Sequence, residues 1–342
     1  MATPLKPLSE QVVVLTGATS GIGLVTARLL APRVAGLVIV ARNRDALDAL
    51  HAELGKTVLP VAADVGAPDE VAHVATQAVA QFGRIDGWVN NAGVAIYGAV
   101  EDVPWDDHRR LFETNYWGVV TGCLEALKQF EKQAAPGKIV TVGSVLSDRA
   151  MIYQGPYSAS KHAVKGFVAA LRAELEAAGR PVSLTLIKPG PIDTPYMEHA
   201  RSFMSDPSDP ARPNGTRNPP PSYDPALVAD AIAYALTHDV RDLNVGGAGW
   251  LFAKLGQLAP RLTDVAVEIV GQATQTSSGT PRPGMRDNLY RPARDLEERS
   301  AMPGPRARRS SLLLAAEKRP AAMLLAGTLL GAGLIAVAKR RR

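Results

Sequence analysis

The stretch Val12-Val13-Val14-Leu15-Thr16-Gly17-Ala18-Thr19-Ser20-Gly21-Ile22-Gly23 decides the fold of this chain. Its first four residues are apolar and mostly β-branched, which predicts a short buried strand. A glycine-rich turn and a helical pattern ending near Pro32 follow. This order places an anion at a helix N-terminus, where backbone N–H groups are free. The residues expected to approach a phosphate are Gly17, Thr19, Ser20, Gly21, Ile22 and Gly23. The alternative is a tight turn that holds no ligand.

The alternation of strand and helix continues downstream. Short apolar runs predict buried strands at 37–41, 58–62, 85–89, 139–142 and 182–187, and a last strand within 242–247. Because helical patterns separate these runs, we expect an α/β fold with a parallel sheet. The 342 residues suffice for one such domain, which we place at 1–271, and for a further segment.

The ends of the second and third strands carry candidate cofactor contacts. An acidic residue at the end of the second strand would bind the ribose 2′-hydroxyl of NAD, but the sequence there is Ala41-Arg42-Asn43. Arg42 is therefore expected to meet a 2′-phosphate, with a plain surface arginine as the alternative. Asp64, followed by Val65, ends the third strand. Its carboxylate is expected either to accept from an adenine amine or to cap the next helix.

Polar residues also mark the middle of the chain. The fourth strand closes in Asn90-Asn91-Ala92-Gly93, a small turn that belongs to the crevice where open α/β sheets bind ligands. Asn115 lies inside a pattern that predicts one long helix over 103–130. Because Asn is disfavoured inside helices, its presence indicates a kink or a held water, or simply a polar position.

The segment from Gly143 to Lys161 carries the candidate chemistry. Tyr157 and Lys161 are four residues apart, which puts both side chains on one face of a helix. A phenol has an ordinary pKa near ~10, and a nearby ammonium lowers that pKa, so the pair is a candidate proton donor and acceptor. Ser144 follows a strand, and its hydroxyl is placed to donate to a carbonyl oxygen. A solvated helix face is the alternative.

Together these motifs make the chain resemble the short-chain dehydrogenase/reductase family over roughly residues 10 to 195. The matching motifs, in the family's order, are Thr16-Gly17-x-x-x-Gly21-Ile22-Gly23, Asp64, Asn90-Asn91-Ala92-Gly93, Asn115, Ser144, Tyr157-x-x-x-Lys161 and Pro189-Gly190. The resemblance implies a doubly wound (Rossmann) fold, with a seven-stranded parallel sheet and helices on both faces. It also implies a nicotinamide cofactor and hydride transfer to or from a carbonyl.

The resemblance also implies a role for each matching residue. Tyr157 would be the general acid/base, Lys161 would bind the nicotinamide ribose and lower the pKa of Tyr157, and Ser144 would steady the substrate oxygen. Asn115 would hold a water that connects Lys161 to solvent. The full set of implied cofactor contacts is Gly17, Thr19, Ser20, Gly21, Ile22, Gly23, Arg42, Asp64, Val65, Asn91, Ala92, Gly93, Tyr157, Lys161, Pro189, Gly190, Ile192 and Thr194. Metal ligands are not expected, because the six histidines are scattered.

Downstream of Thr194 the composition changes several times. A proline-rich stretch, 205–222, predicts an irregular or mobile substrate lid around 191–223. A helix is expected at 225–237 and a C-terminal helical extension at 250–271. Residues 272–320 are polar and rich in Pro, Gly, Ser and Arg, which is typical of a flexible linker.

The last segment, 321–338, has 18 residues without a charge and is flanked by basic residues on both sides. At 1.5 Å per residue it would span about 27 Å, which predicts a single C-terminal transmembrane helix, with a docked Ala-rich helix as the alternative. Residues 282–342 hold 14 Lys and Arg against 5 Asp and Glu, and the rest of the chain holds 24 against 28. The basic excess therefore belongs to the tail, and the folded body is not expected to bind nucleic acid.

These observations predict a membrane-anchored oxidoreductase that prefers NADP(H) over NAD(H). Its catalytic domain is expected in the cytoplasm, because the cofactor is cytosolic and the first apolar run is too short for a signal peptide. Met151, Ile152 and Tyr153 are expected to edge a pocket for a hydrophobic carbonyl or alcohol, and a homo-oligomer is an open possibility. The alternatives are a non-catalytic dinucleotide-binding regulator and a scaffold tethered to the membrane.

Overall fold

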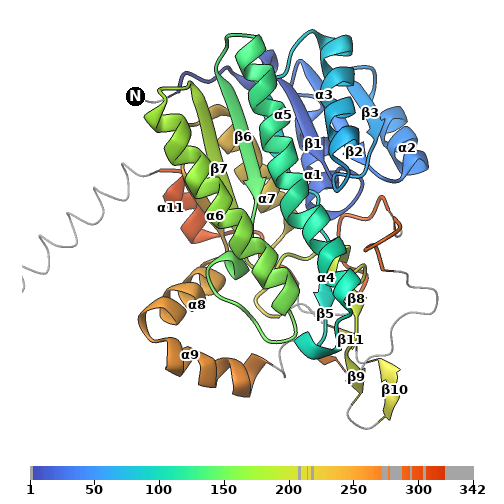
Figure 1. Ribbon diagram of the computed structural model, residues 1–342, viewed down its shortest axis with the longest axis vertical. Helices are drawn as coiled ribbons and strands as arrows, with labels where there is room; N and C mark the ends of the chain where they lie inside the picture. The colour runs from blue at the N-terminus through green and yellow to red at the C-terminus, as the bar shows by residue number, and fades with distance from the viewer. Residues whose placement is uncertain are drawn as a thin grey trace, which may run out of the picture.

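The computed structural model describes residues 3–206, 209–213, 215–216, 219–271, 276–277, 287–292, 295–302 and 306–319. A seven-stranded parallel sheet forms the centre, in the order β12-β7-β6-β4-β1-β2-β3 (Figure 1). The strands are β1 (Val12–Thr16), β2 (Gly36–Ala41), β3 (Val58–Ala62), β4 (Gly87–Asn90), β6 (Gly137–Val142), β7 (Val182–Pro189) and β12 (Asp242–Val245). From β1 the chain first adds β2 and β3 on one side and then β4, β6, β7 and β12 on the other, so the direction of strand addition reverses beside β1. Ligands bind at such a switch point in open α/β sheets.

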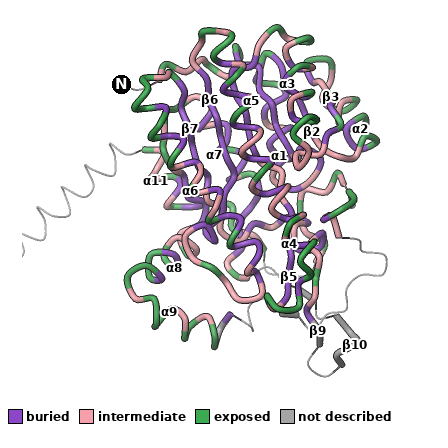
Figure 2. Tube along the Cα trace, in the orientation of Figure 1, coloured by how far each residue is buried: buried purple, intermediate pink, exposed green. Residues whose placement is uncertain are grey.

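Helices cover both faces of the sheet, as the sequence predicts. One apolar core joins the sheet to α1 (Gly21–Leu30), α2 (Arg44–Leu54) and α7 (Pro225–Thr237). The other joins it to α3 (Pro68–Phe82), α5 (Gly118–Lys132) and α6 (Gly155–Ala177). The strands are buried on both sides (Figure 2), which explains why they read as continuous apolar runs.

The long helix expected over 103–130 contains one irregular turn. It consists of α4 (Trp105–Phe112), a π-helical turn (Glu113–Trp117) and α5. The wider turn contains Asn115, which is fully buried. The predicted long helix is therefore present over 105–132, and Asn115 marks a π-helical irregularity within it.

The extension expected at 250–271 is divided. It comprises α8 (Gly247–Leu258), α9 (Pro260–Ala266) and a π-helical turn (Val267–Gly271). The break falls at Ala259, because Pro260 lacks the N–H that a continuing helix needs. The exposed leucines of α8 and α9 are Leu251, Leu255, Leu258 and Leu262. Figure 2 shows that little of these two helices is buried.

The described parts of 272–320 correct the expectation of a flexible linker, because they pack on the domain. Leu289 is fully buried in an apolar cluster that includes Val94 and Leu146. Further on, α11 (Leu312–Glu317) lies along the edge strand β12, where Glu317 accepts hydrogen bonds from the backbone N–H and side-chain amide of Asn244, each at 2.6 Å. The segment therefore covers an open sheet edge, which composition alone does not reveal.

Two predictions concern segments that the structure describes in part or not at all. In the lid region, described backbone forms a 3₁₀ turn (Pro195–Met197) and short strands, β8 (Arg201–Ser202), β9 (Ser205–Asp206), β10 (Asp209–Pro213) and β11 (Gly215–Thr216). The predicted transmembrane segment 321–338 lies outside the described residues. Within the described ranges, none of the helices has the length and apolar character to cross a membrane.

Candidate active site

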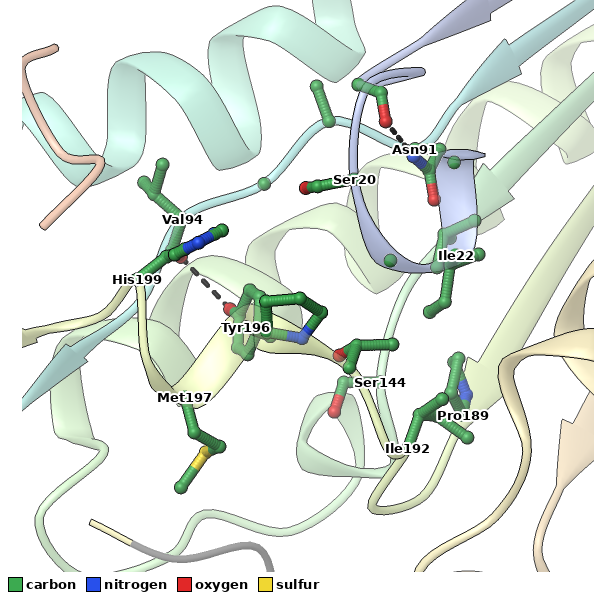
Figure 3. Close-up of a pocket in the computed structure, with 18 of the residues that line it drawn as sticks. Ser20, Ile22, Asn91, Val94, Ser144, Pro189, Ile192, Tyr196, Met197 and His199 are labelled. Atoms are coloured by element: carbon green, nitrogen blue, oxygen red, sulfur yellow. Dashed lines mark hydrogen bonds between the residues drawn. The ribbon is translucent and has the colours of Figure 1, made fainter. Parts of the chain in front are cut away.

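A pocket of about 400 Å³ opens at the carboxyl ends of the strands. Every residue proposed from the sequence to contact the cofactor lines it, and so does Ser144. Figure 3 shows Ser20, Ile22 and Asn91 at one end of this pocket and Tyr196 and Met197 toward the other. Asn115 is not part of the lining and lies buried behind it. The parallel sheet brings these residues together because all of its strands end at the same edge.

The glycine turn fits a pyrophosphate. Gly17 has a φ of +67°, which side chains rarely adopt, and a Cβ on Gly23 would stand 1.8 Å from the Gly17 carbonyl oxygen. Asn91 fixes the turn, because its Nδ2 donates to the carbonyl oxygens of Thr16 at 2.9 Å and of Gly17 at 3.2 Å. The backbone beside the start of α1 is therefore bare of side chains and rigidly held, as close approach to a phosphate requires.

The ends of β2 and β3 hold two arginines and a carboxylate. Arg42 donates to the backbone carbonyl oxygens of Asn288 and Leu289, and burial lowers the pKa of Arg42. Asp64 is paired with Arg110 and also accepts from the Gly66 N–H at 2.9 Å. Of the two roles open to Asp64, the helix cap is not formed, because the N-cap of α3 is Ala67 and no side chain caps it. Asp64 lines the pocket instead.

Ser144, Tyr157 and Lys161 meet at the centre of the pocket. Ser144 caps the 3₁₀ turn Val145–Ser147, and its Oγ accepts from the Leu146 N–H at 3.0 Å. The side chains of Ser144 and Tyr196 lie close enough to Tyr157 to lower its pKa by hydrogen bonding. The Nζ atom of Lys161 donates to the Val142 carbonyl oxygen at 2.9 Å and lies 5.7 Å from the centroid of the Tyr157 ring.

The protonation of this group differs from the expectation. Burial raises the pKa of Tyr157, and the hydrogen bonds with Tyr196 and Ser144 lower it by less. Burial also lowers the pKa of Lys161 to about 8. Desolvation is thus the largest influence on Tyr157, whose pKa lies above its ordinary value of about 10, so its hydroxyl keeps its proton at neutral pH.

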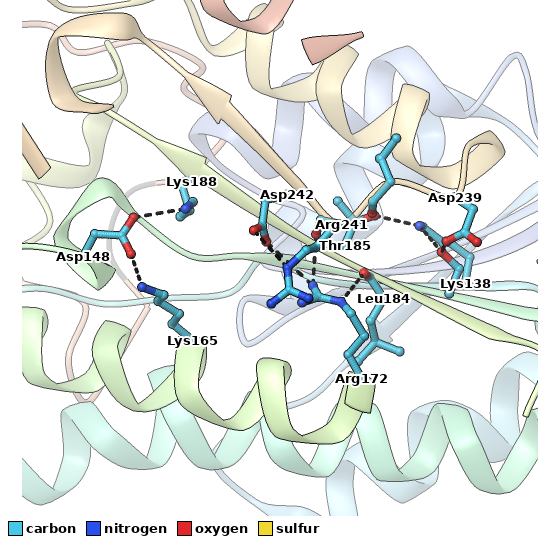
Figure 4. A network of polar contacts seen from close by, with 12 residues as sticks. Lys138, Asp148, Lys165, Arg172, Leu184, Thr185, Lys188, Asp239, Arg241 and Asp242 are labelled. Atoms are coloured by element: carbon cyan, nitrogen blue, oxygen red, sulfur yellow. Dashed lines mark hydrogen bonds and ion pairs between the residues drawn. The ribbon is translucent and has the colours of Figure 1, made fainter. Parts of the chain in front are cut away.

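The side chains of Asn115 and Asp148 connect the elements that carry the site residues. The Asn115 side chain accepts from the Val94 N–H at 2.9 Å and donates to the Val94 carbonyl oxygen at 3.0 Å. It also donates to the Ser160 hydroxyl at 3.1 Å, which joins the π-helical turn to α6. Asp148, four residues after Ser144, pairs with Lys165 on α6 and with Lys188 on β7 (Figure 4). The loop that bears Ser144 is therefore tied to the helix that bears Tyr157.

Some residues of the site were not singled out from the sequence. Tyr196 stacks edge-on against Tyr157 with ring centroids 5.8 Å apart, and its hydroxyl donates to the Val94 carbonyl oxygen at 3.1 Å, as Figure 3 shows. His199 and Asp295 also line the pocket. The position of Tyr196 directly after Thr194-Pro195 is the one sequence signal available. Of the three residues expected to edge the pocket, Met151 lines it, whereas Ile152 and Tyr153 do not.

A doubly wound sheet, a phosphate-binding turn and a buried Ser-Tyr-Lys group define a dinucleotide-binding oxidoreductase. A family model described as short chain dehydrogenase matches residues 11–205. The chain belongs to this short-chain dehydrogenase/reductase family and is a NAD(P)-dependent dehydrogenase or reductase.

Three known proteins illustrate the similarity. The uncharacterized oxidoreductase YxnA of Bacillus subtilis is 40% identical over 341 residues, which cover 99% of this chain and 92% of that protein. A 3-ketodihydrosphingosine reductase of Bacteroides thetaiotaomicron is 31% identical over 192 residues, covering 56% of this chain and 68% of that protein. This chain is also similar to a short-chain dehydrogenase/reductase of Burkholderia phymatum, whose crystal structure was solved in complex with NAD. The two sequences are 25% identical, the TM-score is 0.65, and the match covers 75% of this chain and 96% of that chain.

Proposed function

We propose that this protein is an NADPH-preferring reductase of a hydrophobic carbonyl compound, with Tyr157 as the general acid. The observation that carries the proposal is that Tyr157 and Ser144, both buried, line the same pocket as the glycine turn and Lys161. Because burial raises the pKa of Tyr157, the residue rests in its protonated form. That form is the one that reduction of a carbonyl requires.

Ser144, Tyr157, Lys161 and Asn115 would each have a separate role in the reduction. The Ser144 hydroxyl donates to the substrate oxygen and holds it beside the Tyr157 hydroxyl. Tyr157 gives its proton to that oxygen as negative charge develops there. The tyrosinate that remains is stabilised by the ammonium of Lys161, and Asn115 holds the helices around it in register. A nicotinamide cofactor, when bound through the glycine turn, supplies the hydride.

A hydrophobic substrate is supported by the lining of the substrate half of the pocket. The apolar and aromatic side chains there are Val94, Tyr97, Leu146, Met151, Met197 and Phe252. Phe252 comes from α8, which also carries the exposed Leu251, Leu255 and Leu258. The relative from Bacteroides is named as a reductase of a sphingoid ketone, a lipid carbonyl.

The experiment that tests the proposed function is a chain-length series. Purified protein is mixed with NADPH and methyl ketones of four to twelve carbons, and loss of the reduced nicotinamide absorbance is followed. Each buried CH₂ contributes about 0.8 kcal/mol, so kcat/KM is expected to rise roughly fourfold per carbon until the pocket is filled. Activity confined to small hydrophilic carbonyls would contradict the proposed substrate class.

The cofactor preference is proposed to rest on Arg42. Its guanidinium lines the pocket at the end of β2, where the strand itself offers no carboxylate. A charge-assisted contact to a 2′-phosphate contributes about 1.5–3 kcal/mol, so Arg42→Ala is expected to weaken NADPH binding by about tenfold to a hundredfold and NADH binding much less. Dissociation constants from quenching of tryptophan fluorescence measure this.

Arg44→Ala is the matched control for Arg42→Ala. Arg44 lies two residues further on, begins α2 and forms an exposed ion pair with Asp48, and it does not line the pocket. Its removal is expected to leave both dissociation constants within about twofold. An unchanged ratio of NADPH to NADH affinity in Arg42→Ala would refute the role given to Arg42.

Residues 321–338 are proposed to anchor the protein in a membrane, with the catalytic domain in the cytoplasm. The support is the uncharged apolar composition of the segment and the basic residues on each side of it. We expect the full chain to sediment with membranes and to stay there in carbonate, whereas a chain ending at residue 317 is released. A full chain that high salt or carbonate washes off would refute the anchor.

A further inference from the structure

Residues 287–292 and 295–299, which we call the C-terminal strap, contribute Asn288, Pro292 and Asp295 to the lining of the pocket. The strap makes backbone hydrogen bonds with the glycine turn itself. The Gly21 N–H donates to the Glu297 carbonyl oxygen at 2.9 Å, and the Leu296 N–H donates to the Thr19 carbonyl oxygen at 2.7 Å. Leu289 anchors the strap in the core. A segment distant in sequence thus contacts the turn that is expected to hold a phosphate.

The strap places a carboxylate at the end of β2. Asp295 accepts from the Thr19 hydroxyl at 2.8 Å and from the Asn43 side-chain amide at 2.7 Å, and it lines the pocket. Thr19 belongs to the glycine turn, and Asn43 caps α2 immediately after β2. The strand end Ala41-Arg42-Asn43 has no acidic residue of its own. The tail therefore supplies the acceptor that is missing from β2.

The strap also engages Arg42. The guanidinium donates to the carbonyl oxygens of Asn288 and Leu289, and Arg110 donates to the same Leu289 oxygen at 3.1 Å. A 2′-phosphate would have to compete with these carbonyl oxygens for the N–H groups of the Arg42 guanidinium. It would also have to approach the negative charge of Asp295, whereas a free ribose 2′-hydroxyl could donate to that carboxylate.

We propose that Asp295 is a specificity-determining residue for the cofactor, which favours a ribose 2′-hydroxyl and opposes a 2′-phosphate. This inference rests on the proposed function, because it requires that the pocket binds NAD(P)(H). The preference for NADPH is then a balance between two charges at the end of β2. Arg42 favours the phosphate, and Asp295, from a different part of the chain, limits that preference.

The test is Asp295→Asn in the full-length protein, with dissociation constants for NADPH and NADH measured by titration calorimetry. Asparagine keeps the size of the side chain, and its amide oxygen still accepts from Thr19 or Asn43, so the strap stays docked. Removal of the charge is expected to tighten NADPH binding about tenfold. NADH binding is expected to stay unchanged or to weaken a few-fold, because Asn is a poorer acceptor for the hydroxyl.

Glu298→Gln serves as the control. Glu298 belongs to the same strap but pairs with Arg28 on α1 at 2.6 Å, and it does not line the pocket. This variant tests whether the loss of any negative charge from the strap tightens NADPH binding. The ratio of NADPH to NADH affinity is expected to stay within about twofold of the wild-type ratio.

Two results overturn the inference. If Asp295→Asn changes the affinity for both cofactors by the same factor, Asp295 only docks the strap. If it weakens NADPH binding, the carboxylate supports the phosphate site instead of opposing it. Wild-type protein that binds neither dinucleotide is a different result, since it refutes the proposed function and the inference with it.

Discussion

Tyr157→Phe is expected to lower kcat by at least about 10²-fold, which is the usual contribution of a general acid. Phenylalanine keeps the ring, so its edge-on contact with Tyr196, at a centroid distance of 5.8 Å, is preserved. The hydroxyl that would give its proton to the substrate oxygen is lost. The residue is buried next to Ser144, and water has little access to replace it. The measurement is single-turnover reduction of the best ketone of the chain-length series.

The control for this variant is Tyr116→Phe. Tyr116 lies in the π-helical turn and packs against Phe167, outside the residues that line the pocket. Its kcat is expected to match that of the wild type. The NADPH dissociation constant of Tyr157→Phe is expected to change less than about threefold, which separates catalysis from binding. A Tyr157→Phe enzyme with unchanged turnover would exclude Tyr157 as the proton donor.

The sequence was sufficient to predict the sheet and the pocket for a physical reason. Parallel strands are buried on both faces and appear as short apolar runs, so their ends can be located in the chain. Because these ends share one edge of the sheet, residues such as Gly17, Asp64 and Asn91 had to lie near one another. The structure confirms this for every proposed cofactor contact.

The protonation of the site could not be predicted in the same way. A sequence gives the spacing of Tyr157 and Lys161, and this spacing suggests that the ammonium lowers the pKa of the phenol. Desolvation depends on how completely the two side chains are buried, which is a property of the packed structure. Both are buried, and the pKa of Tyr157 moves in the opposite direction.

The strap was misread as a linker because its contacts leave little trace in composition. Its hydrogen bonds with the glycine turn involve backbone atoms, which every residue has, and its burial depends on Leu289. Hydrophobic periodicity detects helices and strands, but not an extended segment held in this way. Asp295 and Thr19 are 276 residues apart, and only the fold brings them together.

Gly23→Ala is expected to destabilise the protein by at least about 3 kcal/mol and to weaken NADPH binding at least about tenfold. A Cβ at this position would stand 1.8 Å from the Gly17 carbonyl oxygen and 2.7 Å from Nδ2 of Asn91. The first of these atoms is backbone, so a change of rotamer cannot remove the clash. The glycine turn would have to open away from α1, and the phosphate-binding backbone would move with it. Urea unfolding and cofactor titration measure the two effects.

Gly166→Ala provides the opposite case and shows why the effect belongs to the turn. Gly166 is exposed within α6, and a Cβ there would meet nothing within 4 Å. Alanine is a better helix former than glycine, so this variant is expected to gain about 0.5–1 kcal/mol of stability and to bind NADPH as the wild type does. The same added methyl group is thus expected to lower the stability of the protein at Gly23 and to raise it at Gly166. Wild-type stability and affinity in Gly23→Ala would mean that α1 does not pack as closely on the turn as the 1.8 Å separation requires.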